Sequence, residues 1–192
     1  MKTKVLDNIV TSDELFFMYN QFISTPMWTI TGLSSSFEEE AWQKRYNRAP
    51  NLLVKMQNSG MHHYPFYLWG KTVVYRIKEK LTKENIGFNT NIDRMWLNIT
   101  YSDNDHHWLH KDEDTEPTIS VLLFLTPIWH PDWKGSFSVD GEEYNFKPGS
   151  AVIFDSKEFH MGTSPIENTH GWMRLSCNIV LKKNKKTFDI NR

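Results

Sequence analysis

The sequence predicts a single α+β domain in which two helical segments precede a β-sandwich or short β-barrel. The first part of the chain carries two segments with helical periodicity, and beyond Gly87 the pattern changes to short extended runs separated by turn residues. Helices followed by many short strands are typical of the α+β class. A length of 192 residues suits one domain with one substantial core, and no internal repeat, low-complexity segment or linker is visible.

Two helices are predicted in the first half. Thr11-Ser12-Asp13-Glu14 forms a capping-box pattern, because a hydroxyl at the cap and a glutamate three residues later satisfy exposed N–H groups in both directions. Apolar residues then recur at helical spacing until Ser24-Thr25-Pro26, where the first helix is expected to end. Residues 71–81 predict the second helix, whose apolar stripe is Val73, Val74, Ile77 and Leu81.

The remaining regular structure is expected to be extended. Residues 28–33 suggest a short strand, whereas residues 49–70 are irregular and rich in aromatic side chains. The second half predicts about eight short strands, and the clearest runs are residues 95–101, 118–125, 135–139, 142–146, 151–154 and 171–181. Asp140-Gly141 is a strong hairpin signal, because a type I′ turn needs positive φ at both central residues, and Pro148-Gly149 marks another turn.

Composition and charge narrow the class of protein. The formal charge is -1 and the pI is near 6.7, so there is no overall electrostatic footprint for a polyanion, and nucleic acid is neither indicated nor excluded. The single cysteine, Cys177, rules out an intrachain disulfide and is compatible with a reducing compartment. The N-terminal residues lack the pattern of a signal peptide, and no stretch is apolar enough for a membrane span. We therefore expect a soluble, cytoplasmic protein that does not bind a membrane.

A metal-ligand pattern stands in the second half. His110 and Asp112 are two residues apart, so both side chains leave the same face of a strand. Together with His160 from a distant strand they would form the two-histidine, one-carboxylate set that suits non-haem Fe(II) and leaves one face of the ion open. A second copy, His130-Pro131-Asp132, is a poorer pair, because Pro131 disrupts a strand and too few residues separate it from His160. The paired histidines at 62–63 have no carboxylate or thiol at ligand spacing.

Five elements in this order resemble the 2-oxoglutarate/Fe(II)-dependent oxygenases, and most of all their prolyl-hydroxylase branch. The elements are Tyr101, His110-x-Asp112, Phe124-Leu-Thr-x-x-Trp129 before Gly135, Lys147-Pro-Gly149 with Phe154 and His160, and Arg174-x-Ser176. The resemblance covers about residues 94–182, roughly half of the chain, and rests on the order and spacing of the five elements together.

The resemblance implies a fold and a reaction. The fold would be a double-stranded β-helix (jelly-roll or cupin-like) core over residues 91–182, supported by a helical region at residues 1–90, in one oxygenase domain spanning residues 1–192. The reaction would be hydroxylation of a C–H bond of an unidentified small-molecule or peptide substrate, with use of molecular oxygen and release of succinate and CO2. Relatives that halogenate replace the carboxylate ligand with a small residue, so Asp112 favours hydroxylation.

The resemblance also implies a role for each site residue. His110, Asp112 and His160 would hold Fe(II). Arg174 would pair with the far carboxylate of 2-oxoglutarate, because a planar guanidinium matches a carboxylate and keeps its charge in a desolvated pocket. Ser176, on the same face of the strand, and Tyr101 would donate further hydrogen bonds to the co-substrate.

Three positions depart from the family's pattern. Phe124 stands where many members have a tyrosine, so one hydrogen bond to the co-substrate is missing or supplied elsewhere. Lys134-Gly135 replaces the common glycine pair, and Asn104 replaces a turn glycine, although asparagine tolerates positive φ. None of these changes removes a ligand.

Three rival functions stay open. The first is a nucleic-acid dealkylase of the same superfamily, suggested by Asn98 and Asp114, although Val180 stands where that branch has a second arginine. The second is a catalytically inactive metal-binding β-sandwich that serves as a binding module, and the third is a cupin-like enzyme with other chemistry. The expected walls of a substrate mouth are residues 64–69 and 129–134.

Overall fold

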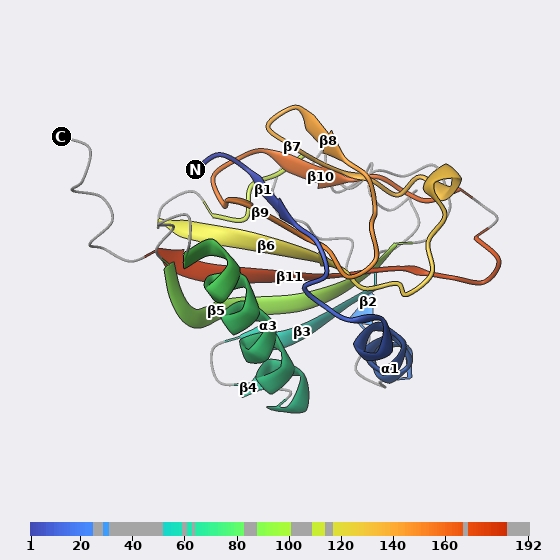
Figure 1. Cartoon of the computed structure of the whole chain (residues 1–192), viewed down its shortest axis with the longest axis horizontal. Helices are drawn as coiled ribbons and strands as arrows, with labels where there is room; N and C mark the ends of the chain where they lie inside the picture. Colours follow the sequence, from blue (N-terminus) through green and yellow to red (C-terminus); the bar gives the residue numbers. More distant parts are fainter. Residues whose placement is uncertain are drawn as a thin grey trace.

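The computed structural model of the chain describes nine stretches of it: residues 1–24, 29–30, 52–58, 61–62, 64–82, 88–100, 109–113, 117–166 and 169–183. Within these stretches the fold consists of two antiparallel β-sheets and two helices (Figure 1). The α+β class predicted from the sequence is therefore confirmed.

The larger sheet, here the major sheet, has eight strands. Along the sheet their order is β1 (Lys4–Leu6), β9 (Ala151–Asp155), β6 (Thr118–Phe124), β11 (Arg174–Lys183), β5 (Phe88–Thr100), β3 (Leu52–Asn58) and β2 (Thr29–Ile30), with β4 (Met61–His62) paired to β3. The minor sheet has the order β10 (His160–Gly162), β7 (Phe137–Val139) and β8 (Glu142–Tyr144). A short 3-10 helix, η1 (Pro131–Trp133), lies in the loop that leads to β7.

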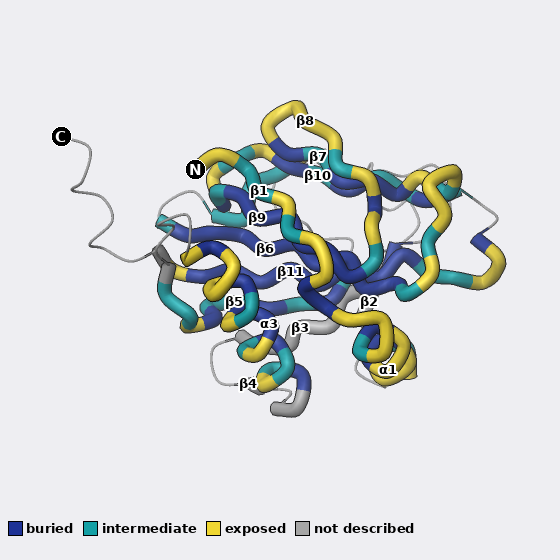
Figure 2. Tube along the Cα trace, in the orientation of Figure 1, coloured by how far each residue is buried: buried dark blue, intermediate teal, exposed yellow. Residues whose placement is uncertain are grey.

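The two faces of the major sheet pack against different layers. One face contacts α1 (Ser12–Ile23) and α3 (Tyr64–Thr82) through the main apolar core, to which α3 contributes the predicted stripe Val73, Val74, Ile77 and Leu81. The other face packs on the minor sheet through a second apolar cluster, whose buried members are Leu122, Phe124, Phe137, Val139, Phe146, Val152 and Phe154. Strands β6, β9 and β11 lie between these layers and are buried along most of their length (Figure 2).

Local signals in the sequence account for several element boundaries. At the start of α1, Glu14 N–H donates to Thr11 Oγ1 at 3.3 Å and Thr11 N–H donates to Glu14 Oε2 at 3.0 Å, so the predicted capping box is present. Asp140 and Gly141 have φ values of 51° and 78° and join β7 to β8, as a type I′ hairpin requires. None of the described helices is both long and apolar enough to cross a membrane.

Other expectations need correction. Helix α3 begins at Tyr64 and not at residue 71, and the irregular region before it contains β3. Phe66 and Trp69 pack on Phe22 in the main core, with ring centroids 4.6 and 5.6 Å away. Residues 64–69 therefore begin a helix on the face of the major sheet that is opposite the minor sheet. They do not line a substrate mouth beside His160, as the sequence had suggested. Strand β1 was not expected from the sequence, and β10 was expected only as the strand that carries His160, without bounds.

Candidate metal centre

Three side chains of the kinds that bind metal ions, from distant parts of the sequence, lie together beside the second apolar cluster. His110, Asp112 and His160 each offer one ligand atom, and these atoms lie within 4.8 Å of one another. The backbones of His110 and His160 form an antiparallel bridge with N···O distances of 3.0 and 2.9 Å, and their ring centroids are 4.3 Å apart. This bridge joins the segment that carries two of the side chains to the strand that carries the third.

The imidazole of His160 is oriented by the protein. Its Nδ1 lies 3.0 Å from the carbonyl oxygen of Glu158, which can only accept, so Nδ1 carries the hydrogen and Nε2 of the neutral ring is left with a lone pair. Nε2 is buried, makes no hydrogen bond within the described residues, and lies 3.5 Å from Asp112 Oδ1. The ring packs on Phe154, with centroids 4.8 Å apart. A neutral histidine whose second nitrogen bonds a carbonyl is the usual form of a metal ligand.

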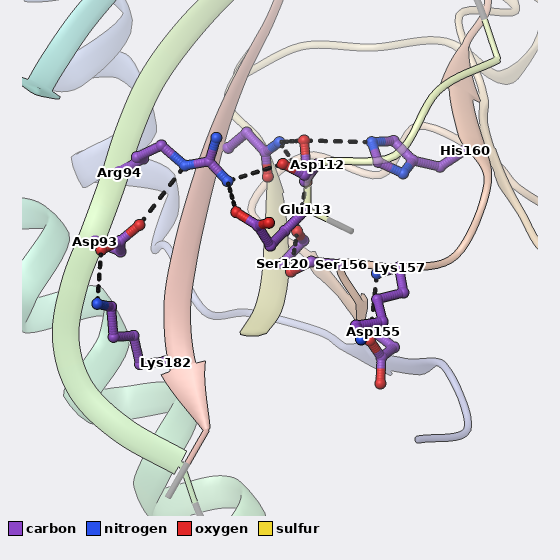
Figure 3. A network of polar contacts seen from close by, with 11 residues as sticks. Asp93, Arg94, Asp112, Glu113, Ser120, Asp155, Ser156, Lys157, His160 and Lys182 are labelled. Atoms are coloured by element: carbon purple, nitrogen blue, oxygen red, sulfur yellow. Dashed lines mark hydrogen bonds and ion pairs between the residues drawn. The ribbon is translucent and has the colours of Figure 1, made fainter. Parts of the chain in front are cut away.

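Asp112 is held by donors on one side of its carboxylate (Figure 3). Ser120 Oγ donates to Oδ2, and Asn178 Nδ2 lies 3.1 Å from Oδ2 and 3.2 Å from Oδ1. An ionised carboxylate can only accept hydrogen bonds, so the hydroxyl hydrogen of Ser120 points to Asp112. Ser120 Oγ therefore accepts a hydrogen bond from Ser156 Oγ, which lies 2.9 Å away. Oδ2 therefore has two donors, which leaves Oδ1, the oxygen nearer His160, as the better placed metal ligand.

The backbone around Asp112 is anchored as well. The N–H groups of Asp112 and Glu113 donate to Ser156 O at 3.1 and 3.2 Å. From β5, Arg94 donates to Asp112 O at 2.8 Å and pairs with Glu113 at 3.5 Å (Figure 3). Asp93 lies 3.7 Å from Arg94 and 3.6 Å from Lys182. The segment that carries Asp112 is thus tied both to β5 and to the residues after β9.

The same contacts determine the charge of Asp112. Burial raises the pKa of this carboxyl, but contact with His160 in its protonated form, together with the donors Ser120 and Asn178, outweighs it and brings the pKa down to about 2. When the His160 ring is neutral, Ser120 and Asn178 still favour the ionised carboxylate. The group is therefore ionised at neutral pH, as a metal ligand must be.

A buried guanidinium, that of Arg174, lies at the start of β11. Arg174 has almost no exposed area, its Nε donates to Gly135 O at 2.7 Å, and its Nη2 donates to Ser136 O at 3.2 Å. Nη1 has only a long contact, 3.5 Å to Thr100 Oγ1, and within the described residues no carboxylate forms an ion pair with this guanidinium. Burial lowers the pKa of Arg174 to about 10, so it stays charged at neutral pH.

Strand β11 brings the two groups together. Its alternation places Arg174, Ser176 and Asn178 on the face toward the minor sheet, while Leu175, Cys177 and Ile179 enter the main core. Ser176 is buried opposite Phe124 of β6 and Asn98 of β5, and its hydroxyl makes no hydrogen bond within the described part of the chain. Cys177 is a free thiol whose pKa is raised by burial, in agreement with an inert structural residue.

Some residues singled out from the sequence lie outside the described residues, and others lie on the surface away from the candidate metal centre. Tyr101, Asn104 and Asp114 fall outside the described residues, as does Trp108 before the ligand pair. The second His-x-Asp copy is on the surface: His130 caps η1 and its exposed side chain lies 3.4 Å from that of Asp132. This pair is far more accessible than the buried carboxylate of Asp112.

Four residues of the site were not predicted from the sequence: Arg94, Ser120, Ser156 and Asn178. Two of them carried a signal. Ser120 interrupts the apolar run of β6, and Asn178 follows Arg174 and Ser176 at strand spacing. Arg94 and Ser156 act through backbone contacts that only the folded structure brings about.

The chain resembles known oxygenases in its fold but not in its sequence. No protein-family model matches the chain, and no curated protein matches it by sequence. By structure, the chain has the fold of prolyl hydroxylases and other 2-oxoglutarate/Fe(II) oxygenases.

Three solved structures illustrate this likeness. A prolyl-4-hydroxylase from Pseudomonas putida superposes with a TM-score of 0.61 and 16% identity, over 95% of this chain and 92% of that chain. A prolyl hydroxylase from Trichoplax adhaerens, solved with a peptide of the hypoxia inducible factor oxygen degradation domain, gives 0.64 and 12% over 96% and 84%. The non-haem, alpha-ketoglutarate-dependent epimerase SnoN from nogalamycin biosynthesis gives 0.61 and 9% over 94% and 77%.

Proposed function

We propose that this protein is a non-haem Fe(II) and 2-oxoglutarate-dependent dioxygenase that hydroxylates a C–H bond of a small-molecule or peptide substrate and releases succinate and CO2. Its core is then a double-stranded β-helix at residues 91–182, supported by residues 1–90. The observation that carries the proposal is a two-histidine, one-carboxylate set close to Arg174, a buried guanidinium that has no carboxylate partner within the described residues. Asn178, on the same face of β11 as Arg174, contacts the carboxylate of this set. A metal site does not need a buried arginine beside it, and a buried arginine does not need a metal site, so their occurrence together is informative.

His110, Asp112 and His160 fit Fe(II) as ligands. The set offers two imidazoles and one carboxylate, and the buried lone pair of His160 Nε2 lacks any other partner within the described residues. When bound, Fe(II) with 2-oxoglutarate supplies the oxidising chemistry. The chain keeps Asp112 ionised and gives His160 the tautomer that a ligand needs.

Arg174 fits the far carboxylate of 2-oxoglutarate. A guanidinium has five N–H donors, and the carbonyls of Gly135 and Ser136 take one from Nε and one from Nη2. The donors left over belong to Nη1 and the outer side of Nη2, which together form a fork that matches a carboxylate. A buried charge with only neutral partners is costly, so an anionic ligand is the expected complement. Ser176 and Tyr101 are the further co-substrate donors in this proposal.

The substrate is proposed only by class. The Trichoplax relative was solved with a peptide and SnoN is an epimerase, so this fold accommodates different substrates and outcomes. Hydroxylation is proposed here because the carboxylate ligand Asp112 is present and buried between its donors.

The test is the turnover of 2-oxoglutarate to succinate in the presence of Fe(II), without added substrate. The wild-type protein should show this slow activity, and His110→Ala should abolish it. His130→Ala, which removes an exposed histidine of the rival His-x-Asp pair, is the matched control and should retain it. Undiminished turnover in His110→Ala, or none in the wild-type protein, would contradict the proposal.

A further inference from the structure

The turn that supplies the carbonyl partners of Arg174 has an unusual backbone. Lys134 has φ 57° and ψ −136°, and Gly135 follows with φ 73°. An L-residue rarely adopts positive φ, so the conformation of Lys134 must be held by its surroundings. Trp129 provides such a contact, because its indole Nε1–H donates to Lys134 O at 2.9 Å.

Trp129 also packs against the turn and against the guanidinium's neighbours. A Cβ added to Gly135 would lie 2.9 Å from Trp129 Cζ2 and 3.0 Å from Arg174 Cδ, so the indole, the turn and the arginine leave no space between them. The Trp129 ring centroid is 4.5 Å from that of Phe146, and Arg174 Cζ lies 5.6 Å from the same Phe146 ring. The indole and the Arg174 side chain therefore meet on the same side of Gly135, and both pack near the Phe146 ring.

The position of the turn determines which edge of Arg174 is free. The carbonyls of Gly135 and Ser136 occupy the edge formed by Nε and Nη2, and this leaves the Nη1–Nη2 end for a ligand. If the turn rotated, these carbonyls would move with it and the guanidinium would lose the contacts that orient it. Bidentate recognition of a carboxylate depends strongly on such orientation.

We propose that Trp129 is a positioning residue for the co-substrate: by holding the Lys134–Gly135 turn, it fixes the edge of Arg174 that receives the C5 carboxylate of 2-oxoglutarate. This inference rests on the proposed function, and it goes beyond it by assigning a specificity role to a residue that touches neither metal nor co-substrate.

The experiment compares binding of two keto acids to the Mn(II)-loaded protein by calorimetry. One is 2-oxoglutarate, and the other is 2-oxovalerate, which has the same chain length but lacks the C5 carboxylate. Trp129→Phe keeps a ring against Phe146 but removes the N–H donor and part of the indole that packs on the turn. Its Kd for 2-oxoglutarate should rise about five- to tenfold, the effect of one lost hydrogen bond, while its Kd values for 2-oxovalerate and for Mn(II) stay unchanged.

Two further variants complete the design. Gly135→Ala should show the same selective loss, because its Cβ would push on Arg174 Cδ. Tyr144→Phe is the control, since it also removes an aromatic donor, but one that bonds Glu142 on β8 at 2.7 Å and not the carbonyl of Lys134. It should bind both keto acids as the wild type does.

The possible results separate the two proposals. Equal weakening of both keto acids in Trp129→Phe and Gly135→Ala, or no weakening in either variant, would overturn the role of Trp129 while leaving the proposed function intact. If the wild-type protein binds Mn(II) but has equal Kd values for 2-oxoglutarate and 2-oxovalerate, Arg174 does not bind the C5 carboxylate. Both proposals would then fail.

Discussion

The side-chain amide of Asn178 donates to the carboxylate of Asp112, with Nδ2 3.1 Å from Oδ2 and 3.2 Å from Oδ1. Asn178 lies four residues after Arg174 on β11, so one strand face carries both the guanidinium and a donor to the carboxylate of the proposed metal site. A hydrogen-bonded strand between two neighbours is among the most rigid parts of a protein. The distance between the candidate metal and the candidate carboxylate site is therefore set by the backbone of β11.

Removal of the other donor to Asp112 tests how the metal ligand is held. In Ser120→Ala the Oδ2 atom loses one of its two donors, and the carboxylate becomes free to turn. We expect the affinity for Mn(II), measured by calorimetry, to fall by about tenfold or more, as is usual when a group behind a metal ligand is lost.

Ser138→Ala is the control for this variant, because Ser138 lies on the outward side of β7, between the inward-facing Phe137 and Val139. It should bind Mn(II) like the wild type. Equal affinities for the Ser120→Ala variant and the wild-type protein would show that Ser120 does not position Asp112.

Metal binding should raise the melting temperature. A ligand that binds only the native state at 100 times its Kd adds about 2.7 kcal/mol to the free energy of unfolding. For a chain of this length this corresponds to an increase of about 5–10 °C in the melting temperature. Calorimetric scans with and without Mn(II) measure the shift, and Asp112→Ala should abolish it. A shift of the same size in Asp112→Ala would place the metal elsewhere.

Loss of the buried guanidinium should act on the co-substrate and not on the metal. Arg174→Gln keeps a polar side chain but removes the charge. Truncating one partner of a buried, hydrogen-bonded charge pair typically costs 2–5 kcal/mol or more, so the Kd for 2-oxoglutarate should rise on the order of 100-fold. Mn(II) affinity should change by less than about twofold, because Arg174 contacts none of the three proposed ligands. Parallel loss of both affinities would indicate a folding defect.

Local signals in the sequence were sufficient where a short motif determines the backbone. The capping box at Thr11 and the Asp140-Gly141 turn are of this kind, since each forms through contacts within a few residues. Strands β1 and β10 have three residues each, too few to show an alternating pattern. The first turns of α3 escaped prediction because their aromatic residues are placed by packing on Phe22, a contact across the chain.

The candidate site divides in the same way. His110, Asp112, His160 and Arg174 were singled out because their residue types and order are unusual together. The roles of Ser120 and Asn178 depend on β6 and β11 being neighbours, with Ser120 opposite Val180 and Asn178 opposite Leu122. The function of a serine in a strand cannot be predicted from the sequence, because it depends on which carboxylate the fold places beside it.

Stability should depend on pH through the contact between α1 and α3. Arg76 Nη1 donates to Glu14 Oε2 at 2.7 Å and also to Ile9 O at 3.2 Å, so it ties the start of α1 and the segment before it to α3. The hydrogen bond from Arg76, opposed in part by burial, lowers the pKa of Glu14 below its ordinary value of 4.5. The folded state then binds a proton at Glu14 less readily than the unfolded state does.

The sign follows from this difference. The stabilisation is fully present above the unfolded pKa and is lost as pH falls through the lower, folded pKa. Urea unfolding at pH 7 should show Glu14→Gln to be less stable than the wild type by about 1 kcal/mol, as both groups are partly exposed and the pair is screened. The gap should shrink as the pH is lowered from 4.5 through the lower pKa that Glu14 has in the folded state. Lys147→Gln, which removes the more exposed ion pair with Asp7, is the control and should change stability by less at pH 7. A gap between Glu14→Gln and wild type that stays constant with pH would mean that the capping hydrogen bonds, and not the ionised carboxylate, carry the effect.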